Sequence, residues 1–339
     1  MNSDFAPSWF NRISKRIDEF PIPYWLTYIL YGLILYLLGI LINWIQTGER
    51  FPNWEPIVYV ILFQAAYFPL IIHYMDKLAL RAYSEVEAII KSSKKKLPDF
   101  KKLLTVMPAK QTWLVSLASL LFVVLLGYVG SQQLEGASAI PIGFDLMGIF
   151  TLIVLVLLWL ANGLVTYHSV RQLRVVDYLL SNFVTIHPFH QKELFTFSKL
   201  SASIGITTII VGPLWIIFDP GITSLVISLI FAALSSIAFI SPLLGAHRIL
   251  ELEKDRLLNQ NGKHTEASLF QLEKAISKNT KADLEIINLR LSTLERARSQ
   301  IDQISTWPWK LTTLRQFSAA IVVPLLIWLI QYFLSNALL

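Results

Sequence analysis

Seven stretches of about 20 apolar residues constrain the fold more than any other feature of the sequence, because an α-helix of that length crosses the ~30 Å hydrocarbon core of a bilayer. Hydrophobic residues make up 54% of the chain and charged residues 15%, which leaves too little polar surface for a soluble exterior. We therefore expect an all-α, polytopic membrane protein that crosses the lipid bilayer seven times. The predicted spans are residues 24–45, 56–74, 111–130, 144–167, 200–218, 222–246 and 316–338.

The basic residues predict how these spans are oriented. Of the 29 Lys and Arg residues, 28 fall in segments on one side of the predicted membrane, and Arg50 is the exception. Loops rich in Lys and Arg stay in the cytosol. The N-terminus is therefore expected inside and the C-terminus outside, in a multi-pass protein of the plasma or inner membrane. The first span is expected to act as its own insertion signal, because the preceding residues contain Asp4, Asp18 and Glu19 and no long apolar core.

The net charge of +6 does not indicate a nucleic-acid partner, because the basic residues are spread over the loops that topology requires to be basic. The run at residues 91–96 contains four lysines. It either acts as a topology determinant, which we favour, or binds anionic lipid headgroups at the inner leaflet.

The chain divides into four regions. Residues 1–23 form a cytoplasmic N-terminus, and residues 24–246 hold helices one to six with cytoplasmic helical extensions in their loops. Residues 247–306 form a cytoplasmic helical anchor segment, and residues 307–339 form the seventh helix. Apolar residues continue at helical spacing beyond the fourth and sixth spans, so we expect both helices to extend into the cytosol.

A heptad-like pattern runs through the anchor segment. Its positions alternate by four and three: Thr280, Leu284, Ile287, Leu291, Leu294, Arg298 and Ile301. The pattern fits a helix that packs on symmetry mates, and it fits equally a helix that lies on its own subunit. The sequence Trp307-Pro308-Trp309 is expected to end this helix at the membrane, because proline cannot donate the hydrogen bond that would continue it.

The predicted spans contain no Lys, Arg, Asp or Glu, apart from Asp145 at an outer edge. Proton pumps, voltage sensors and retinal proteins are therefore disfavoured, because such proteins depend on intramembrane charge. His73 and His168, at the cytoplasmic ends of two spans, are interpreted as interfacial hydrogen-bonding groups. We expect neither an enzyme nor a cofactor, because nucleotide-binding, metalloprotease and serine hydrolase motifs are missing and the chain has no Cys. His187 and His190 are too few ligands for a metal site.

The last span carries the residues we favour for a pore. Gln316, Ala320, Val323, Ile327 and Gln331 share one helical face with an amide at each end and an apolar middle. Such a face is able to line a water-filled path with a hydrophobic constriction. The alternative is that the amides merely reach the two membrane interfaces.

In layout the chain resembles the seven-transmembrane ion channel superfamily of insect odorant and gustatory receptors. The resemblance is that of a distant, non-insect member. Gln316-Phe317 matches the Gln-Phe of the gustatory signature at the last span, without the accompanying Thr-Tyr. The resemblance implies a homotetramer, with residues 280–304 as the anchor and residues 316–331 at the pore. It also implies a small organic ligand in the outer half of the bundle, where Tyr59, Phe63, Tyr128 and Phe150 lie; packing or lipid contact explains these aromatic residues as well and is favoured.

The leading hypothesis is thus a ligand-gated cation channel. Its cation preference is expected from the acidic outer loops, which contain Glu49, Glu55, Glu135, Asp145 and Asp219. One alternative is a non-conducting sensor or scaffold that signals through its cytoplasmic helices. The other is a facilitator-type transporter, which ranks last because the spans show no internal repeat.

Overall fold

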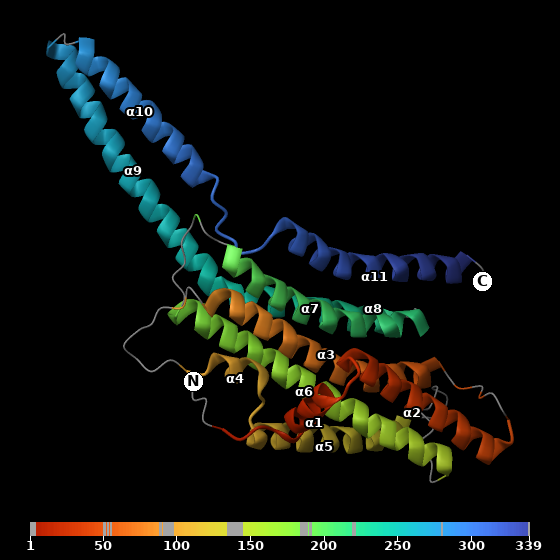
Figure 1. Ribbon diagram of the computed structural model, residues 1–339. Coiled ribbons are helices and arrows are strands. Elements are labelled where there is room, and N and C mark those ends of the chain that lie inside the picture. The colour runs from red at the N-terminus through yellow and green to blue at the C-terminus, as the bar shows by residue number, and fades with distance from the viewer. Residues whose placement is uncertain are drawn as a thin grey trace.

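The computed structural model describes residues 5–49, 52, 54, 56–87, 90, 98–133, 145–183, 189, 192–218, 222–278 and 281–337. Within these residues the regular secondary structure is helical, and an isolated β-bridge joins Pro7 and Pro108. The all-α prediction is confirmed to this extent. The helices, drawn in Figure 1, are α1 (Trp9–Glu19), α2 (Tyr24–Thr47), α3 (Pro56–Val86), α4 (Phe100–Thr105), α5 (Ala109–Gln133), α6 (Leu146–Asn182), α7 (Lys192–Phe218), α8 (Ile222–Ile240), η2 (Ser241–Leu243), α9 (Leu244–Lys278), α10 (Lys281–Asp302) and α11 (Leu311–Ala337).

The length and apolar composition of the helices identify the chain as a membrane protein. Five described segments are long and apolar enough to cross a membrane: Tyr24–Thr47, Val58–Val86, Leu146–Asn182, Ser228–Ser277 and Leu311–Leu334. Two shorter apolar segments, Ala109–Leu125 and Leu194–Ile210, coincide with the third and fifth predicted spans. The count of seven spans and the orientation of the termini remain predictions.

Helices α3 and α6 run well past the spans predicted for them. The 37 residues of α6 form one helix, which is about 55 Å long and exceeds a ~30 Å hydrocarbon core. This agrees with the predicted extension of the fourth span. Helix α3 continues to Val86, although the sequence predicts a span that ends at residue 74. Its apolar face persists through Ile71, Met75, Ala79 and Ala82 at spacings of four and three, and all four side chains are buried.

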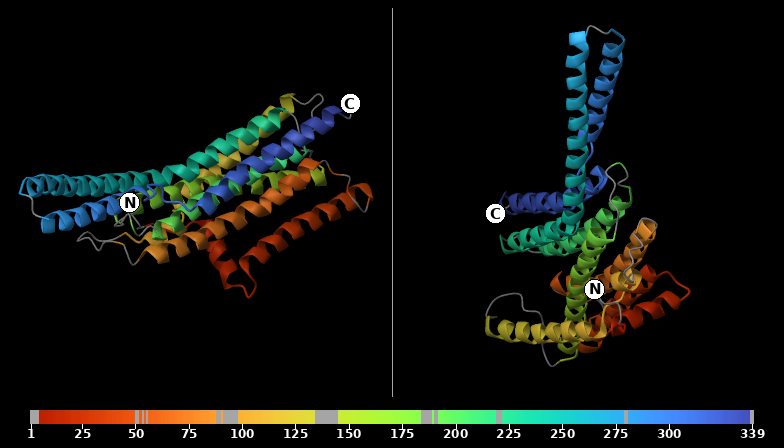
Figure 2. Two further views of the ribbon diagram at one scale, coloured as in Figure 1. Left: turned by 90° about the horizontal axis from the view of Figure 1, so that it is seen from above. Right: turned by 90° about the vertical axis from the view of Figure 1, so that its left-hand side faces the viewer.

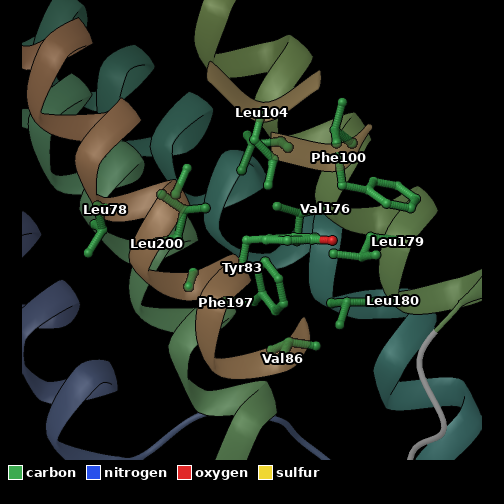
Figure 3. Packing of buried hydrophobic residues seen from close by; sticks show 14 of the residues in the cluster. Leu78, Tyr83, Val86, Phe100, Leu104, Val176, Leu179, Leu180, Phe197 and Leu200 are labelled. Atoms are coloured by element: carbon green, nitrogen blue, oxygen red, sulfur yellow. The ribbon is translucent and has the colours of Figure 1, made fainter. Parts of the chain in front are cut away.

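These extensions hold the largest cluster of buried apolar residues in the described part of the chain. The cluster joins α3, α4, α6, α7 and the start of α9. Figure 3 shows Tyr83 and Val86 of α3 facing Phe100 of α4, Leu179 of α6 and Phe197 of α7. The described parts of α3, α4, α6 and α7 that lie between the predicted spans therefore belong to the packed bundle.

A second buried cluster joins α2, α3 and α6 in the half of the bundle farther from the hairpin described below. Gly39 of α2 lets these helices approach closely. A Cβ at this position would lie 2.7 Å from Cη2 of Trp54 and 3.0 Å from Cε1 of Phe150. A larger residue at position 39 would therefore displace one of these rings.

Helices α9 and α10 form a long hairpin that leaves the bundle (Figure 2). Helix α8 passes into α9 through the 3-10 turn η2, where Pro242 lacks the backbone N–H that a continuous α-helix uses. The 35 residues of α9 span about 52 Å. The sequence predicts an extension of the sixth helix to residue 259, and the observed helix is longer because it continues through Gly262.

The seam of this hairpin consists of small residues on α9 and large ones on α10. On α9, the buried residues Asn261, Ser268 and Ala275 are seven positions apart. Across the seam, Ile287 and Ile301 of α10 are also buried. The Nδ2 of Asn261 donates a hydrogen bond to the carbonyl oxygen of Leu294 at 3.1 Å. The heptad-like face of α10 therefore packs on α9 of the same chain, which is the second of the two readings that the sequence left open.

The N-terminal region, predicted only as cytoplasmic, contains the amphipathic helix α1. Ser8 caps this helix, because its Oγ accepts a hydrogen bond from the backbone N–H of Asn11 at 3.2 Å. Phe10 is buried in a cluster with Ile72 of α3, Met107 and Leu164 of α6. Helix α1 is thus docked on the bundle.

Candidate functional site

The five predicted pore residues lie on α11, the least buried of the five candidate spans. Only 6% of its most apolar window is buried, against 61% for that of α3. Val323 is 50% exposed and Ile327 42% exposed, and Gln316 is also exposed. Ala320 and Gln331 are half-buried and border the contact with the bundle. The predicted face therefore straddles the edge of that contact, and most of α11 is left for lipid or another protein to cover.

Helix α11 is held to the bundle near its first turns by Phe317. This side chain is 5% exposed and its ring stacks on Phe239 of α8 with centroids 4.5 Å apart. Gly205 of α7 makes room for it, because a Cβ there would lie 2.7 Å from Cε2 of the ring. In the Gln-Phe pair noted in the sequence, the phenylalanine is therefore the inward anchor and Gln316 is exposed.

Aromatic rings connect the base of the hairpin to α11. The imidazole of His247 in α9 stacks on Trp307 at 4.0 Å with an interplanar angle of 7°. Trp307 stacks on Trp309 at 4.3 Å, and Trp309 on Phe239 at 5.4 Å. Phe239 in turn stacks on Phe317. We call these five residues the ring stack.

Polar contacts tie the same linker to α9. The Nζ of Lys254 donates to the carbonyl oxygens of Asp302 at 2.7 Å and Ile304 at 3.1 Å. A cation at these carbonyls stabilises the C-terminus of α10. The Nδ1 of His247 lies 3.0 Å from the carbonyl oxygen of Thr306 and must carry the proton, because a carbonyl only accepts. The base of the hairpin is therefore attached to the start of α11 through both backbone hydrogen bonds and stacked rings.

A second polar site lies inside the bundle, between α3 and α6. His168 is fully buried, and its Nε2 lies 2.7 Å from Oδ1 of Asp76. The Nε2 of Gln172 donates to the same carboxylate oxygen at 3.2 Å and to the carbonyl oxygen of Leu104 at 2.9 Å. This network joins α3, α6 and the end of α4. Buried polar groups in such a network hold the helices in one arrangement.

The buried network keeps unused hydrogen-bonding capacity. Within the described residues, Nδ1 of His168, Oε1 of Gln172 and both terminal nitrogens of Arg171 are buried without a hydrogen-bond partner. The guanidinium of Arg171 lies 5.3 Å from the ring centroid of Phe5, so it has a cation–π contact.

One turn earlier on α3, His73 links that helix to α1 and α2. Its Nε2 lies 3.0 Å from Oδ1 of Asp18, and Lys77 pairs with the same carboxylate at 2.8 Å. Ser14 contacts the His73 Nδ1 at 3.2 Å, and the ring of Tyr24 stacks on the imidazole at 4.5 Å. Partial burial raises the pKa of Asp18, but the hydrogen bond from Lys77 and the nearby His73 lower it by more, so its net pKa lies below the usual value.

Asp76 was not among the predicted site residues, because the predicted second span ended at residue 74 and Asp76 fell in the segment after it. Two local signals pointed to it. His73 and Asp76 are three residues apart on the amphipathic continuation of α3, and His168 and Gln172 are four residues apart on α6. The interpretation of the two histidines as hydrogen-bonding groups fits their contacts, although both are buried within the bundle.

The four predicted ligand-binding aromatic residues do not form one described site. Tyr59 and Phe63 line a groove between α2 and α3 together with Tyr36 and Tyr67. Phe150 is 7% exposed and packs in the buried cluster of α2, α3 and α6. The side chain of Tyr128, near the end of α5, lies outside the described residues.

The acidic outer residues are described only in part. Asp145 and Gln46 lie side by side at one end of α6 and α2, where Nε2 of Gln46 donates to the Asp145 carboxylate at 2.5 Å. The Oε1 of Gln46 accepts a hydrogen bond from the backbone N–H of Met147 at 2.9 Å. Gln46 thus provides an acceptor for one of the N–H groups in the first turn of α6 that have no partner within the helix. Glu55, Glu135 and Asp219 lie outside the described residues.

The fold and these contacts define a helical membrane protein with a long helical hairpin joined to its last apolar helix. Among the described residues, no group of three or more His, Asp or Glu side chains forms a metal site, and His187 and His190 lie outside them. No protein-family model, curated protein or solved structure matches the chain.

Proposed function

We propose that the protein is a homotetrameric, ligand-gated cation channel in which α11 lines the central pore. The observation that carries the proposal is the exposure of α11, which is apolar along its length but covered by its own chain at only 6% of its most apolar window. Four copies around an axis would cover this helix and bring the exposed Gln316, Val323 and Ile327 toward one another.

In this proposal Gln316 and Gln331 form hydrated ends of the pore, about 22 Å apart along the helix. Val323 and Ile327 lie between them and form the apolar constriction that gates by dewetting. The ring stack and Lys254 join this helix to the hairpin, so the hairpin sets the position of the gate. A small organic ligand opens the channel in this proposal, and the groove of Tyr59 and Phe63 is the favoured site for it.

The proposal includes seven spans with the N-terminus in the cytosol and the C-terminus outside, in the plasma or inner membrane. Helices α5 and α7 support the count, because they are 25 and 27 residues long. Accessibility labelling of single cysteines placed in each connecting segment tests the orientation. The natural chain has no Cys, so each label reports one position.

Single-channel recording in planar bilayers tests conduction. Ile327→Ser should raise the basal open probability, because a polar residue at the constriction keeps it wet. The matched control is Leu329→Ser, an exposed residue of the same helix on the side opposite the proposed pore face. Charged thiol reagents should block Val323→Cys channels and spare Phe333→Cys channels. Absence of conductance in all these variants, together with a monomer in native mass spectrometry, would refute the proposal.

A second candidate, a non-conducting sensor or scaffold, is favoured by exposed apolar residues on the hairpin. Leu252, Phe270 and Leu289 are each 70% exposed. Large exposed apolar side chains are candidate contacts for a partner protein. Phe270→Glu should then abolish capture of a soluble partner, whereas Gln271→Glu, its exposed neighbour, should not. Unchanged capture by the Phe270→Glu variant would rule out this surface.

A further inference from the structure

A cavity of about 480 Å³ lies between α3, α6, α7 and α8. Its volume falls in the range of about 300–1,000 Å³ found for small-molecule sites. It is distinct from the groove of Tyr59 and Phe63, with Tyr67 as the one residue that borders both. The residues that line it on α6 extend from Asn162 to Asp177, a distance of about 22 Å along the helix. The cavity is therefore long and narrow.

The deep part of the cavity is apolar in effect, although several hydroxyl groups line it. Thr166 donates to Asn162, and Thr207 and Thr208 both donate to Ile204, in each case to a backbone carbonyl of their own helix. The hydroxyl of Tyr67 contacts the carbonyl oxygen of Thr207 at 3.5 Å. Because these donors are already used, the walls offer a ligand mainly hydrocarbon contacts, from residues such as Phe231 and Leu234.

The opposite end carries two unlike charges. Arg174 and Asp177 line the cavity one turn apart on α6, and both are exposed. Within the described residues Arg174 has no ion-pair partner, and the one hydrogen bond of Asp177 is a long one of 3.5 Å from Ser181. Side chains of opposite charge that border one opening without pairing with each other match a headgroup that carries both charges.

From this arrangement we propose that the cavity binds one acyl chain of a zwitterionic phospholipid with a primary ammonium headgroup. The phosphate pairs with the guanidinium of Arg174, which forms planar, bidentate contacts with phosphate oxygens. The ammonium pairs with the carboxylate of Asp177. The acyl chain extends along α6 toward Phe231.

The position of the cavity gives such a lipid a structural role. Ser241, the first residue of the 3-10 turn between α8 and α9, also lines it. Close to the same end, a Cβ on Gly245 of α9 would lie 3.0 Å from Oδ1 of Asp177. A bound lipid therefore fills the angle between α6 and the α8–α9 junction and fixes the direction in which the hairpin leaves the bundle.

Native mass spectrometry of the full chain in detergent tests the proposal, with phosphatidylethanolamine and phosphatidylglycerol as the two added probes. One phosphatidylethanolamine should be retained per chain in preference to phosphatidylglycerol. Arg174→Ala and Asp177→Ala should each weaken its retention about tenfold, as expected from the loss of one charge-assisted contact. Arg248→Ala, an exposed basic residue of α9 outside the cavity, is the matched control and should not change retention. Equal or stronger retention of phosphatidylglycerol would overturn recognition of the zwitterion.

A second measurement does not depend on the variants. A phosphatidylethanolamine with a photoreactive group at the end of its acyl chain should label the deep wall, within residues 162–166, 204–208 or 231–234, and excess unlabelled lipid should suppress this labelling. Labelling that is spread over the outer surfaces of α2 and α11 and is insensitive to competition would overturn the site. Neither measurement requires conduction, so the lipid site and the channel stand or fall separately.

Discussion

Phe317 of α11 lies directly over Gly205 of α7, with room for a hydrogen atom at position 205 but not for a methyl group. A Cβ there would be 2.7 Å from the ring and 3.1 Å from the carbonyl oxygen of Ser235. This contact attaches the last helix to α7 and α8 near its first turns.

We expect Gly205→Ala to destabilise the protein by about 1–3 kcal/mol, because the added methyl overpacks the contact with Phe317. Gly262→Ala is the matched control. No atom lies within 4 Å of a Cβ at that position in α9, so this change should be neutral or stabilise by up to about 1 kcal/mol. Thermal unfolding in detergent measures both. Equal effects of the two substitutions would contradict the packing described here.

Lys254→Met should loosen the C-terminus of α10 by about 1 kcal/mol, because two carbonyl oxygens lose a charged donor. Hydrogen exchange should become faster over residues 299–306 and stay unchanged at the far end of the hairpin. Lys263→Met, an exposed lysine of the same helix with no described partner, should leave the exchange as it is. If hydrogen exchange of residues 299–306 were as slow in the Lys254→Met variant as in the natural chain, other contacts would hold the linker.

The contact between Asp18 and Lys77 predicts a specific dependence of stability on pH. Because the folded pKa of Asp18 lies below its unfolded value of about 3.9, its contribution is complete above that pH and is lost as pH falls through the folded pKa. Asp18→Asn should therefore lower the Tm near neutral pH, and the difference from the natural chain should shrink below about pH 4. The side chain is 40% exposed, so the effect should be modest. Glu285→Gln, on the exposed face of α10, should show no such trend.

Asp76 and His168 should be energetically coupled. Asp76→Leu or His168→Leu alone leaves a buried polar partner unpaired, which costs about 1–3 kcal/mol. The double variant should lose less than the two single losses combined, with an interaction energy of about 0.5–3 kcal/mol. Denaturation in mixed micelles measures all three variants. A cycle that pairs His168→Leu with the distant Glu273→Leu should be additive, and additivity in the Asp76 cycle would show that the buried contact contributes nothing.

The features that could be predicted from the sequence are those encoded by local periodicity. The apolar face of α6 continues without a break, so the sequence predicts that this helix extends beyond its span. The spacing of Ile287, Leu294 and Ile301 likewise predicted the helix α10. The predicted anchor covered residues 280–304, and the observed helix ends earlier, at Asp302, before the Trp307-Pro308-Trp309 sequence that was expected to end it. The pattern identified a face that needs a partner, and the structure supplies α9 as that partner.

The features that could not be predicted depend on contacts between distant segments. Asp76 and His168 are 92 residues apart, and Lys254 and Ile304 are 50 apart. No spacing rule within one helix connects such pairs. The second span was also predicted to end where the first polar residues begin, although the buried face of α3 continues past them. The rotation of α11 against the bundle also could not be predicted, because the contact of Phe317 with Gly205 decides it. This rotation leaves part of the predicted pore face, Ala320 and Gln331, half-buried.

The length of the hairpin has a mechanical consequence. Helix α9 is about 52 Å long, so a tilt of about 5° at the 3-10 turn moves its far end by about 4.5 Å. The ring stack lies close to the turn and moves through a small fraction of that distance. The hairpin is in this sense a lever whose long arm is α9 and whose short arm ends at Trp307 and α11. A force on the far end of α9 would therefore act at the start of the last helix as a larger force over a shorter path.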